Sequence, residues 1–270
     1  MDAKELKKKC DVIRLESIRM TTKAASGHPS SCLSCAEIVG VLLLDIMDVD
    51  ADNPDNPTRD RFILSKGHAA PAYYVALALR GFFPQEKLET LRELGSILQG
   101  HPDMKKTPGV DFSTGSLGMG LSVANGMALA GRLDNTGSNI YVVMGDGELQ
   151  EGQVWEAAMT SSHYSLSNIV AIVDRNNLQC DGTTESIMAL EPLDEKFRAF
   201  GWEVFEVDGH DVASLQNIIR KARDVDDRPS IIIAHTYKGK GVSCMQDKLK
   251  WHGKPLSGKE YEDAVKECSL

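Results

Sequence analysis

The pattern of apolar and polar positions changes near residue 110, and the two parts of the chain predict different structures. Residues 2–24 place apolar side chains at helical spacing among charged ones, and residues 34–47 and 71–79 repeat this pattern. We therefore expect the first hundred residues to be mostly helix and loop.

From about residue 110, short apolar runs alternate with amphipathic stretches. The runs, which are predicted strands, lie at 139–144, 168–173, 202–207 and 230–234. The stretches, which are predicted helices, lie at 120–133, 151–163 and 211–224. This alternation predicts an α/β fold in which a parallel sheet carries helices on both faces, after a helical N-terminal lead-in. No repeat or flexible linker interrupts residues 1–270, so we expect a single domain.

Two of the predicted strands end in side chains that suit a metal ion. One runs into Gly145-Asp146-Gly147, and the next along the chain is followed by Asn176. Right-handed crossovers place the loops after parallel strands along one edge, where α/β proteins bind ligands. Asp146 and Asn176 there offer hard oxygen ligands for Mg²⁺, and the flanking glycines let the backbone approach a phosphate. Alone, the Gly-Asp-Gly run suits an ordinary turn equally well; together the two loops predict a metal-diphosphate site.

Four histidines lie in loops marked by glycine or proline: His28, His68, His101 and His252. Taken singly, each is more readily explained as a surface or capping residue. Four in similar loops favour a shared function, because imidazoles bind sugar hydroxyls or phosphates and move protons near neutral pH. We interpret the remaining three, His163, His210 and His235, as structural.

Residues 114–120, Thr-Gly-Ser-Leu-Gly-Met-Gly, open a predicted helix with a glycine-rich turn. The order of the glycines does not fit a dinucleotide-binding loop, and no strand clearly precedes it. A diphosphate contact is the functional interpretation, and a capped glycine turn is the alternative.

Composition narrows the class of protein further. The net charge of −9 argues against a nucleic-acid or anionic-membrane surface. The longest apolar run, at 38–44, is far shorter than the roughly 20 residues that span a bilayer, and the charged amino terminus lacks a signal core, so we expect a cytoplasmic protein. Six scattered cysteines suit a reducing compartment. Cys32 and Cys35 form a single CxxC motif, which we expect to pack in the core rather than bind metal.

Five segments follow one another in the order found in transketolases. They are 26–29 (Ser-Gly-His-Pro), 60–69, 114–118, Gly145-Asp146-Gly147 with Asn176, and 251–256 (Trp-His-Gly-Lys-Pro-Leu). Over nearly its whole length the chain thus resembles the N-terminal, diphosphate-binding subunit of a split transketolase. The resemblance implies the thiamine diphosphate-binding fold, with thiamine diphosphate and Mg²⁺ as cofactors; Ca²⁺ or Mn²⁺ can substitute for Mg²⁺.

The resemblance also implies a role for each site residue. The implied metal ligands are Asp146, Asn176 and the main-chain carbonyl of Leu178. The implied catalytic histidines are His28, His101 and His252. The implied cofactor contacts are His68, Gly115, Leu117, Gly147, Glu151, Asn176 and His252, with Glu151 also at a dimer contact.

Transketolases built as one chain continue past the 251–256 segment into a pyrimidine-binding domain and a third domain, whereas this sequence stops at Leu270. The missing half carries the glutamate that activates the cofactor and the arginines that grip the substrate phosphate. The resemblance therefore implies that the partner is a C-terminal transketolase subunit, in an expected α2β2 heterotetramer. The implied ketol donor is xylulose 5-phosphate, and the acceptor is ribose 5-phosphate or erythrose 4-phosphate.

Three alternatives stay open on the sequence alone. A related split enzyme could act on an unusual branched or sulfonated sugar. The chain could be the diphosphate-binding half of a deoxyxylulose phosphate synthase or an oxo-acid dehydrogenase, although the Ser-Gly-His-Pro and Trp-His-Gly-Lys-Pro-Leu segments count against this. It could also be a non-catalytic module that has kept the cofactor fold, which the intact metal ligands and loop histidines disfavour.

Overall fold

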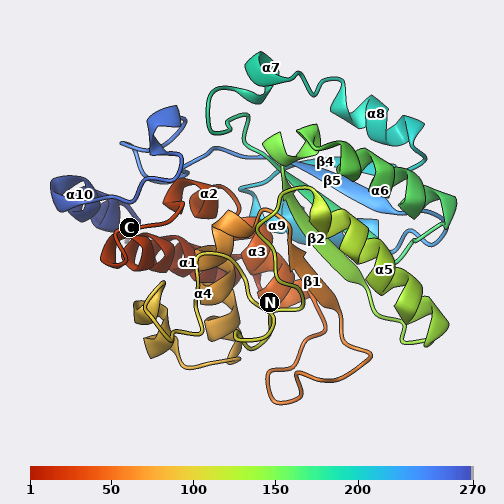
Figure 1. Cartoon of the computed structure of the whole chain (residues 1–270), viewed down its shortest axis with the longest axis horizontal. Helices are drawn as coiled ribbons and strands as arrows, with labels where there is room; N and C mark the ends of the chain where they lie inside the picture. Colours follow the sequence, from red (N-terminus) through yellow and green to blue (C-terminus); the bar gives the residue numbers. More distant parts are fainter. Residues whose placement is uncertain (269–270) are drawn as a thin grey trace.

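The computed structural model describes residues 1–268, which fold around a five-stranded, fully parallel sheet with helices on both faces (Figure 1). Its strands are β1 (Arg61–Leu64), β2 (Ile140–Gly145), β3 (Ile169–Arg175), β4 (Glu203–Asp208) and β5 (Ser230–His235). The spatial order is β1-β2-β3-β5-β4, and every neighbouring pair is parallel. The predicted α/β class is confirmed.

The four strands predicted from the sequence match β2 to β5 within two residues, whereas β1 is not among them. Only four residues form β1, too few to show the alternation or apolar run that marks a strand. Its backbone pairs with β2 from Arg61 opposite Ile140 to Leu64 opposite Val143. Tertiary pairing therefore makes a strand of a segment that the sequence pattern leaves unmarked.

Alternate residues of each strand enter two separate apolar cores. On β2, Tyr141 and Val143 face one core, whereas Val142 and Met144 face the other. The first core contains side chains of α1 (Ala3–Lys23), α3 (Ala36–Val41), α4 (Ala70–Arg80) and α9 (Val212–Arg223). The second contains side chains of α5 (Met119–Leu133), α6 (Gly152–His163) and α8 (Leu193–Ala199). Both faces of the sheet are thus covered, as the nearly unbroken apolar strands require.

The predicted helix over 34–47 is divided in the structure. It consists of α2 (Pro29–Ser34), α3 and a π-helical turn over Leu42–Ile46. Cys35 lies between α2 and α3 with φ −103° and ψ 11°, outside helical geometry. Pro29 begins α2 at its first position, where the missing N–H of proline costs nothing, so this helical region starts earlier than predicted.

Shorter elements complete the chain. They are α7 (Thr184–Ile187), α10 (Gly258–Cys268) and 3-10 turns at Gly67–Ala69, Gln85–Thr90, Gly147–Gln150 and Leu249–Trp251. In Figure 1, α1, α2, α4 and α10 gather beside the sheet. The N-terminal amino group pairs with Asp45 of the π-helical turn. Within residues 1–268, no helix is both long and apolar enough to cross a bilayer.

The cysteines of the single CxxC motif lie in the core. Cys32 and Cys35 are both fully buried, and neither forms a disulfide. Burial raises the pKa of Cys32 to about 11 and that of Cys35 to about 12, so both are thiols at neutral pH. This is the packing role expected from the sequence.

The carboxyl ends of four strands lead into loops that meet at one edge of the sheet. Lys66 follows β1, Asp146 follows β2, Asn176 follows β3 and Lys238 follows β5. Strand register brings two of these strand ends together, because Gly145 of β2 lies opposite Asp174 of β3. The fold therefore concentrates polar side chains at the edge where α/β sheets usually bind ligands.

Candidate active site

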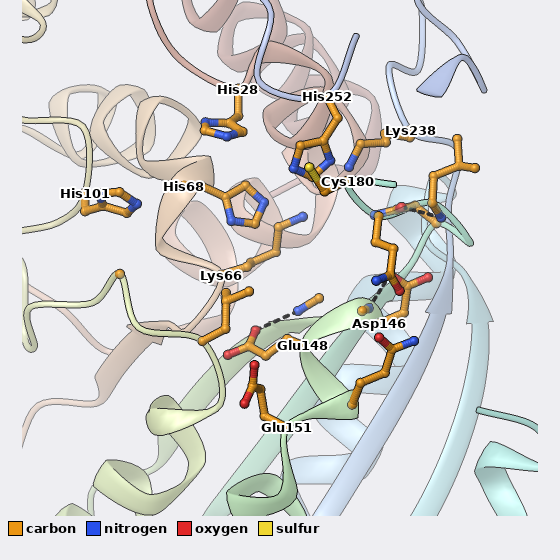
Figure 2. Close-up of a pocket in the computed structure, with 18 residues that line it drawn as sticks. His28, Lys66, His68, His101, Asp146, Glu148, Glu151, Cys180, Lys238 and His252 are labelled. Carbon is orange, nitrogen blue, oxygen red and sulfur yellow. Dashed lines mark hydrogen bonds between the residues drawn. The ribbon is translucent and has the colours of Figure 1, made fainter. Parts of the chain in front are cut away.

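A cavity of about 440 Å³, here called the edge cavity, lies where these loops meet (Figure 2). Every predicted site residue lines it: His28, His68, His101, Gly115, Leu117, Asp146, Gly147, Glu151, Asn176, Leu178 and His252. Lys66, Glu148, Cys180 and Lys238 line it as well. Figure 2 shows the four histidines on one side of the cavity and Asp146, Glu148 and Glu151 on the other. The structure thus brings all the predicted residues together, while their individual roles remain predictions.

Three of the histidine rings form a cluster. The ring centroids of His28 and His68 are 5.0 Å apart, those of His28 and His252 are 5.5 Å apart, and those of His68 and His252 are 6.0 Å apart. Gly253 makes this approach possible: it has φ +70°, and a Cβ there would lie 3.2 Å from Nε2 of His28. The Trp-His-Gly segment therefore needs its glycine to dock against α2.

The clustered histidines are uncharged at neutral pH. Burial, followed by the charge of Lys238, lowers the pKa of His28 to about 4 and that of His252 to about 3. The pKa of His68 lies well below its ordinary value because of burial and the charge of Lys66. Neutral imidazoles can each donate one hydrogen bond and accept another, which suits them to hold or move the proton of a hydroxyl group.

The glycine turn before α5 packs against the fourth histidine. Gly115 has φ +151°, and a Cβ there would lie 3.4 Å from the ring of His101. Gly118, at φ +83°, is the residue before α5, whose first residue is Met119. The element directly before this turn is the 3-10 turn Gln85–Thr90 and not a strand, as the sequence indicates. The turn contributes Gly115 and Leu117 to the lining of the cavity, and because Gly115 has no side chain a ligand can approach its main chain closely.

Asp146 is a buried carboxylate whose surroundings favour binding of a cation. Its oxygens accept hydrogen bonds from Gly147 N at 2.8 Å and Asn177 N at 2.6 Å, and Arg175 Nη1 lies 3.2 Å away. Burial, followed by the like charge of Asp174, raises the pKa of Asp146. A divalent cation would offset both effects, so the residues present fit a metal ion.

Asn176 lies beside Asp146 with its amide orientation fixed by hydrogen bonds. Its Oδ1 accepts from Leu178 N at 3.1 Å, and its Nδ2 donates to Asp174 Oδ2 at 3.3 Å. One carboxylate, one amide oxygen and one main-chain carbonyl form a hard donor set that suits Mg²⁺ better than zinc. Across residues 1–268, no group of three or more His, Cys, Asp or Glu side chains is arranged to hold a metal ion.

Glu148 ties together three loops that line the edge cavity, and it is not among the predicted site residues. Its Oε1 accepts from Gly118 N at 2.8 Å and its Oε2 from Gly145 N at 3.0 Å, while the Ser65 hydroxyl donates a further hydrogen bond. Burial raises the pKa of Glu148 despite these bonds. The side chain therefore holds the glycine turn before α5 against the ends of β1 and β2.

Lys66 and Asp174 form a fully buried ion pair at the floor of the site. Asp174 also accepts hydrogen bonds from Ser34 Oγ, at 2.6 Å, and from the Thr236 hydroxyl. Burial alone would raise the pKa of Asp174, but the charge of Lys66 outweighs it and the pKa is lowered. For Lys66, burial would lower the pKa, but the charge of Asp174 outweighs it and the pKa is raised. Both groups are charged at neutral pH, and their partners join α2, β1, β3 and β5.

Lys238 is a second buried cation, and it forms no ion pair with any residue in the described range. Its side chain is 2% exposed, and its Nζ donates to Ser31 Oγ at 3.2 Å. Burial, followed by the charge of Lys66, lowers the pKa of Lys238 to about 8. A buried ammonium group without a carboxylate partner favours an anionic ligand. The edge cavity thus combines a carboxylate suited to a cation with a lysine suited to an anion, the pair of groups that a metal-bound diphosphate would require.

Neither Lys66 nor Lys238 is among the predicted site residues, although the rule that identifies Asp146 applies to both. Each follows the carboxyl end of a strand that reaches the same edge. The sequence does not identify Lys66 as a site residue because β1, the strand that it follows, is not recognisable in the sequence. Lys238 lies three positions beyond His235, the last residue of β5, in the least regular part of the chain. A lysine between strand and glycine, as in Lys238-Gly239, is the signal that could have identified it.

The fold and the site define a class of protein: an α/β domain whose cavity, at the carboxyl edge of a parallel sheet, has side chains suited to a phosphorylated ligand and a metal ion. Residues 6–268 match the family described as transketolase, thiamine diphosphate binding domain. The chain belongs to this family.

Several relatives match over almost their entire length. One is a subunit of the apulose-4-phosphate transketolase of Phocaeicola vulgatus, which is 44% identical over 100% of this chain and 95% of that protein. Another is the 6-deoxy-6-sulfo-D-fructose transketolase subunit SqwG of a Clostridium species, which is 43% identical over 97% of this chain and 96% of that protein.

Longer transketolases match over part of their length. Human transketolase is 43% identical over 97% of this chain but only 42% of its own length. The crystal structure of transketolase from Campylobacter jejuni superposes with a TM-score of 0.93 at 33% identity, covering 100% of this chain and 43% of that one. The chain thus spans less than half of these longer relatives.

Proposed function

We propose that this chain is the cofactor-binding subunit of a two-subunit transketolase, which moves a two-carbon ketol unit from a ketose phosphate to an aldose phosphate. One observation carries the proposal: the edge cavity joins a metal-suited pair, Asp146 and Asn176, to neutral histidines and an unpaired buried lysine. Residues 1–270 act as one domain for the diphosphate end of thiamine diphosphate. A non-catalytic module would have no need of all these groups together.

Asp146, Asn176 and the Leu178 carbonyl would hold Mg²⁺, which would supply positive charge to offset that of the diphosphate. Lys238 would neutralise part of the diphosphate charge. Gly115, Leu117, Gly147 and His68 would contact the cofactor, with Glu151 at a subunit contact near it. When bound, thiamine diphosphate supplies the electron sink for carbon-carbon cleavage.

The histidines would handle the substrate's protons. Nδ1 of His28 and Nδ1 of His252 are buried and have no hydrogen-bond partner among residues 1–268. Both rings are neutral and line the edge cavity, so a ring nitrogen of either could accept a hydrogen bond from a sugar hydroxyl and take its proton during cleavage. His101, at the more exposed side of the cavity, would assist at the reacting centre.

The rest of the site would come from a partner subunit. The two relatives that match over their full length are named as transketolase subunits, which supports a partner that carries the pyrimidine-binding domain. We propose an α2β2 assembly that works with Mg²⁺ in the cytoplasm. Such an arrangement would place the exposed Glu151 against the partner.

The ketose donor has two candidate classes. Xylulose 5-phosphate as donor and ribose 5-phosphate or erythrose 4-phosphate as acceptor are the sugars that the resemblance to transketolases implies. The names of the two full-length relatives instead favour apulose 4-phosphate or 6-deoxy-6-sulfo-D-fructose as donor. A branched or sulfonated ketose therefore stands beside xylulose 5-phosphate as the second candidate.

Affinity purification of the chain from its native cells tests the partner. We expect a protein with a pyrimidine-domain sequence in near-equal amount, and a complex that cleaves at least one of these ketoses without decarboxylating pyruvate. A stable homo-oligomer with no co-purifying chain would refute the two-subunit proposal. Pyruvate decarboxylation would instead indicate a synthase-type or dehydrogenase-type enzyme.

A further inference from the structure

His210 lies outside the edge cavity but contacts the segment that carries Lys238. It follows β4, and its side chain is 7% exposed. Its Nε2 accepts a hydrogen bond from Tyr237 N at 2.9 Å, and its ring stacks on that of Tyr237 at 5.8 Å. Tyr237 directly precedes Lys238 in the chain. One imidazole thus fixes the main chain next to the buried cation.

The other ring nitrogen of His210 is also engaged. Nδ1 lies 3.1 Å from Oε2 of Glu37, a carboxylate that is 1% exposed on α3. Since Nε2 accepts the amide hydrogen of Tyr237, the proton of the neutral ring must be on Nδ1, where Glu37 accepts it. Oε1 of the same glutamate pairs with Arg14 of α1. Two helices therefore hold the ring in one tautomer and one orientation.

Several main-chain bonds hold the segment around Lys238, and His210 supplies the acceptor for one donor in it, the Tyr237 amide. Lys240 N donates to Tyr237 O at 3.1 Å, and Asp247 N donates to Lys238 O at 2.9 Å. Thr236 is tied to Asp174 through its hydroxyl, and Gly239 N donates to Ser30 O at 2.9 Å. Between these anchors, the His210 acceptor is the partner of the Tyr237 amide. The side chain of Lys238 leaves the next Cα and reaches Ser31 Oγ in the edge cavity.

We propose that His210 is a positioning residue: with Glu37 and Arg14 behind it, it holds the Tyr237 peptide so that the Lys238 ammonium group points at the cofactor diphosphate. The proposal rests on the proposed function, because it takes Lys238 to bind that diphosphate. His210 itself touches neither the edge cavity nor its ligand; it lines a separate polar cavity of about 610 Å³ with Glu37 and Lys240.

Two amide substitutions separate the two contacts of the ring. In His210→Gln, the terminal amide reaches the position of Nε2 and can still accept from Tyr237 N, but it loses Glu37. In His210→Asn, the shorter amide reaches the position of Nδ1 and can still donate to Glu37, but it leaves the Tyr237 amide without an acceptor. His235→Asn is the matched control, since His235 is exposed, ends β5 and has a side chain that bonds only Glu206 among residues of the described chain.

Hydrogen exchange in the full-length chain tests the contact without any cofactor. We expect the Tyr237 amide to exchange about five- to tenfold faster in His210→Asn than in the wild type, and at nearly wild-type rate in His210→Gln and His235→Asn. Equal exchange in wild type and His210→Asn would overturn the proposal, whatever the cofactor does.

Cofactor affinity tests the consequence, measured as thiamine diphosphate binding with Mg²⁺ to the complex of this chain and its co-purified partner. We expect His210→Asn to weaken binding about tenfold and His210→Gln to restore most of it. In a Lys238→Met background, His210→Asn should have no further effect. An undiminished effect there would show that His210 does not act through Lys238. A wild-type complex that binds no thiamine diphosphate would refute the proposed function, and the exchange result would still decide the His210 contact by itself.

Discussion

The ammonium group of Lys66 forms a buried ion pair with the carboxylate of Asp174, although the two residues are 108 positions apart. Both side chains are at most 1% exposed, and the pair links the loop after β1 to the end of β3. Removal of one partner leaves an uncompensated charge in the core, which is far costlier than the loss of an exposed pair. The pair therefore stabilises the edge of the sheet that carries the site.

Asp174→Ala should lower the free energy of unfolding by about 3–5 kcal/mol, because Lys66 is left buried and unpaired. In a Lys66→Met/Asp174→Leu double variant, much of this stability should return, since no buried charge remains. Urea unfolding followed by circular dichroism measures both. Lys23→Met is the control, as Lys23 and its partner Glu89 are exposed, and it should change stability by less than about 0.5 kcal/mol. A single variant as stable as the control would contradict this interpretation of the pair.

Asp146→Ala should abolish the dependence of thiamine diphosphate binding on Mg²⁺. The carboxylate is the only charged member of the proposed metal set, so affinity should fall by at least about a hundredfold, beyond the effect of losing an outer-shell partner. Calorimetric titration of the partnered complex with and without Mg²⁺ measures this. Asp134→Ala, at an exposed position after α5, serves as control. Unchanged affinity in Asp146→Ala would place the metal elsewhere.

Stability should fall when the pH is lowered from about 6.5 towards 4, partly because of two histidines. The pKa of His28 is lowered to about 4 and that of His252 to about 3, below the ordinary value of 6.5. In that window the unfolded chain binds more protons than the folded chain, so acid favours unfolding. A His28→Asn/His252→Asn variant should show a shallower fall in denaturant midpoint between pH 6.5 and pH 4. An identical slope would show that the two rings titrate normally.

Lys238 should also make the stability of the fold increase with pH, in this case in the alkaline range. Its pKa is lowered from 10.5 to about 8, so between these values the unfolded chain keeps a proton that the folded chain has released. The contribution of Lys238 to stability should therefore rise by about 3 kcal/mol between pH 8 and pH 10.5. Comparison of the wild type with Lys238→Met isolates this rise from the titration of cysteines and tyrosines. Bound diphosphate should remove it, because an anion keeps the lysine protonated.

Local patterns in the sequence are enough to predict the sheet type, four of its strands and the grouping of the site. Loops at the carboxyl ends of parallel strands must meet, so Asp146 and Asn176 can be placed together without coordinates. The loop histidines and the glycine turn are recognisable because glycine or proline marks each of these loops in the sequence. The residue types at the ends of the two strands predict a metal-diphosphate site, and the resemblance to transketolases implies that the histidines lie beside it; that chemistry stays a prediction.

The features that the sequence does not reveal depend on tertiary structure. β1 is a strand only because β2 pairs with it, and Lys66 is buried only because Asp174 compensates its charge. The break at Cys35, whose backbone lies outside helical geometry, is marked by no glycine or proline in the sequence. The sequence pattern indicates a structural role for His210, and only its distances to Glu37 and the Tyr237 amide connect it with the site.

Transfer of a labelled two-carbon unit tests the central claim most directly. The complex of this chain and its co-purified partner is supplied with thiamine diphosphate, Mg²⁺, ribose 5-phosphate and a ketose labelled at its first two carbons, with xylulose 5-phosphate, apulose 4-phosphate and 6-deoxy-6-sulfo-D-fructose tried in turn. We predict that at least one ketose yields a product whose first two carbons carry the label, and that the Asp146→Ala complex yields none. A correctly assembled, cofactor-loaded complex that transfers label from none of these ketoses would contradict the account.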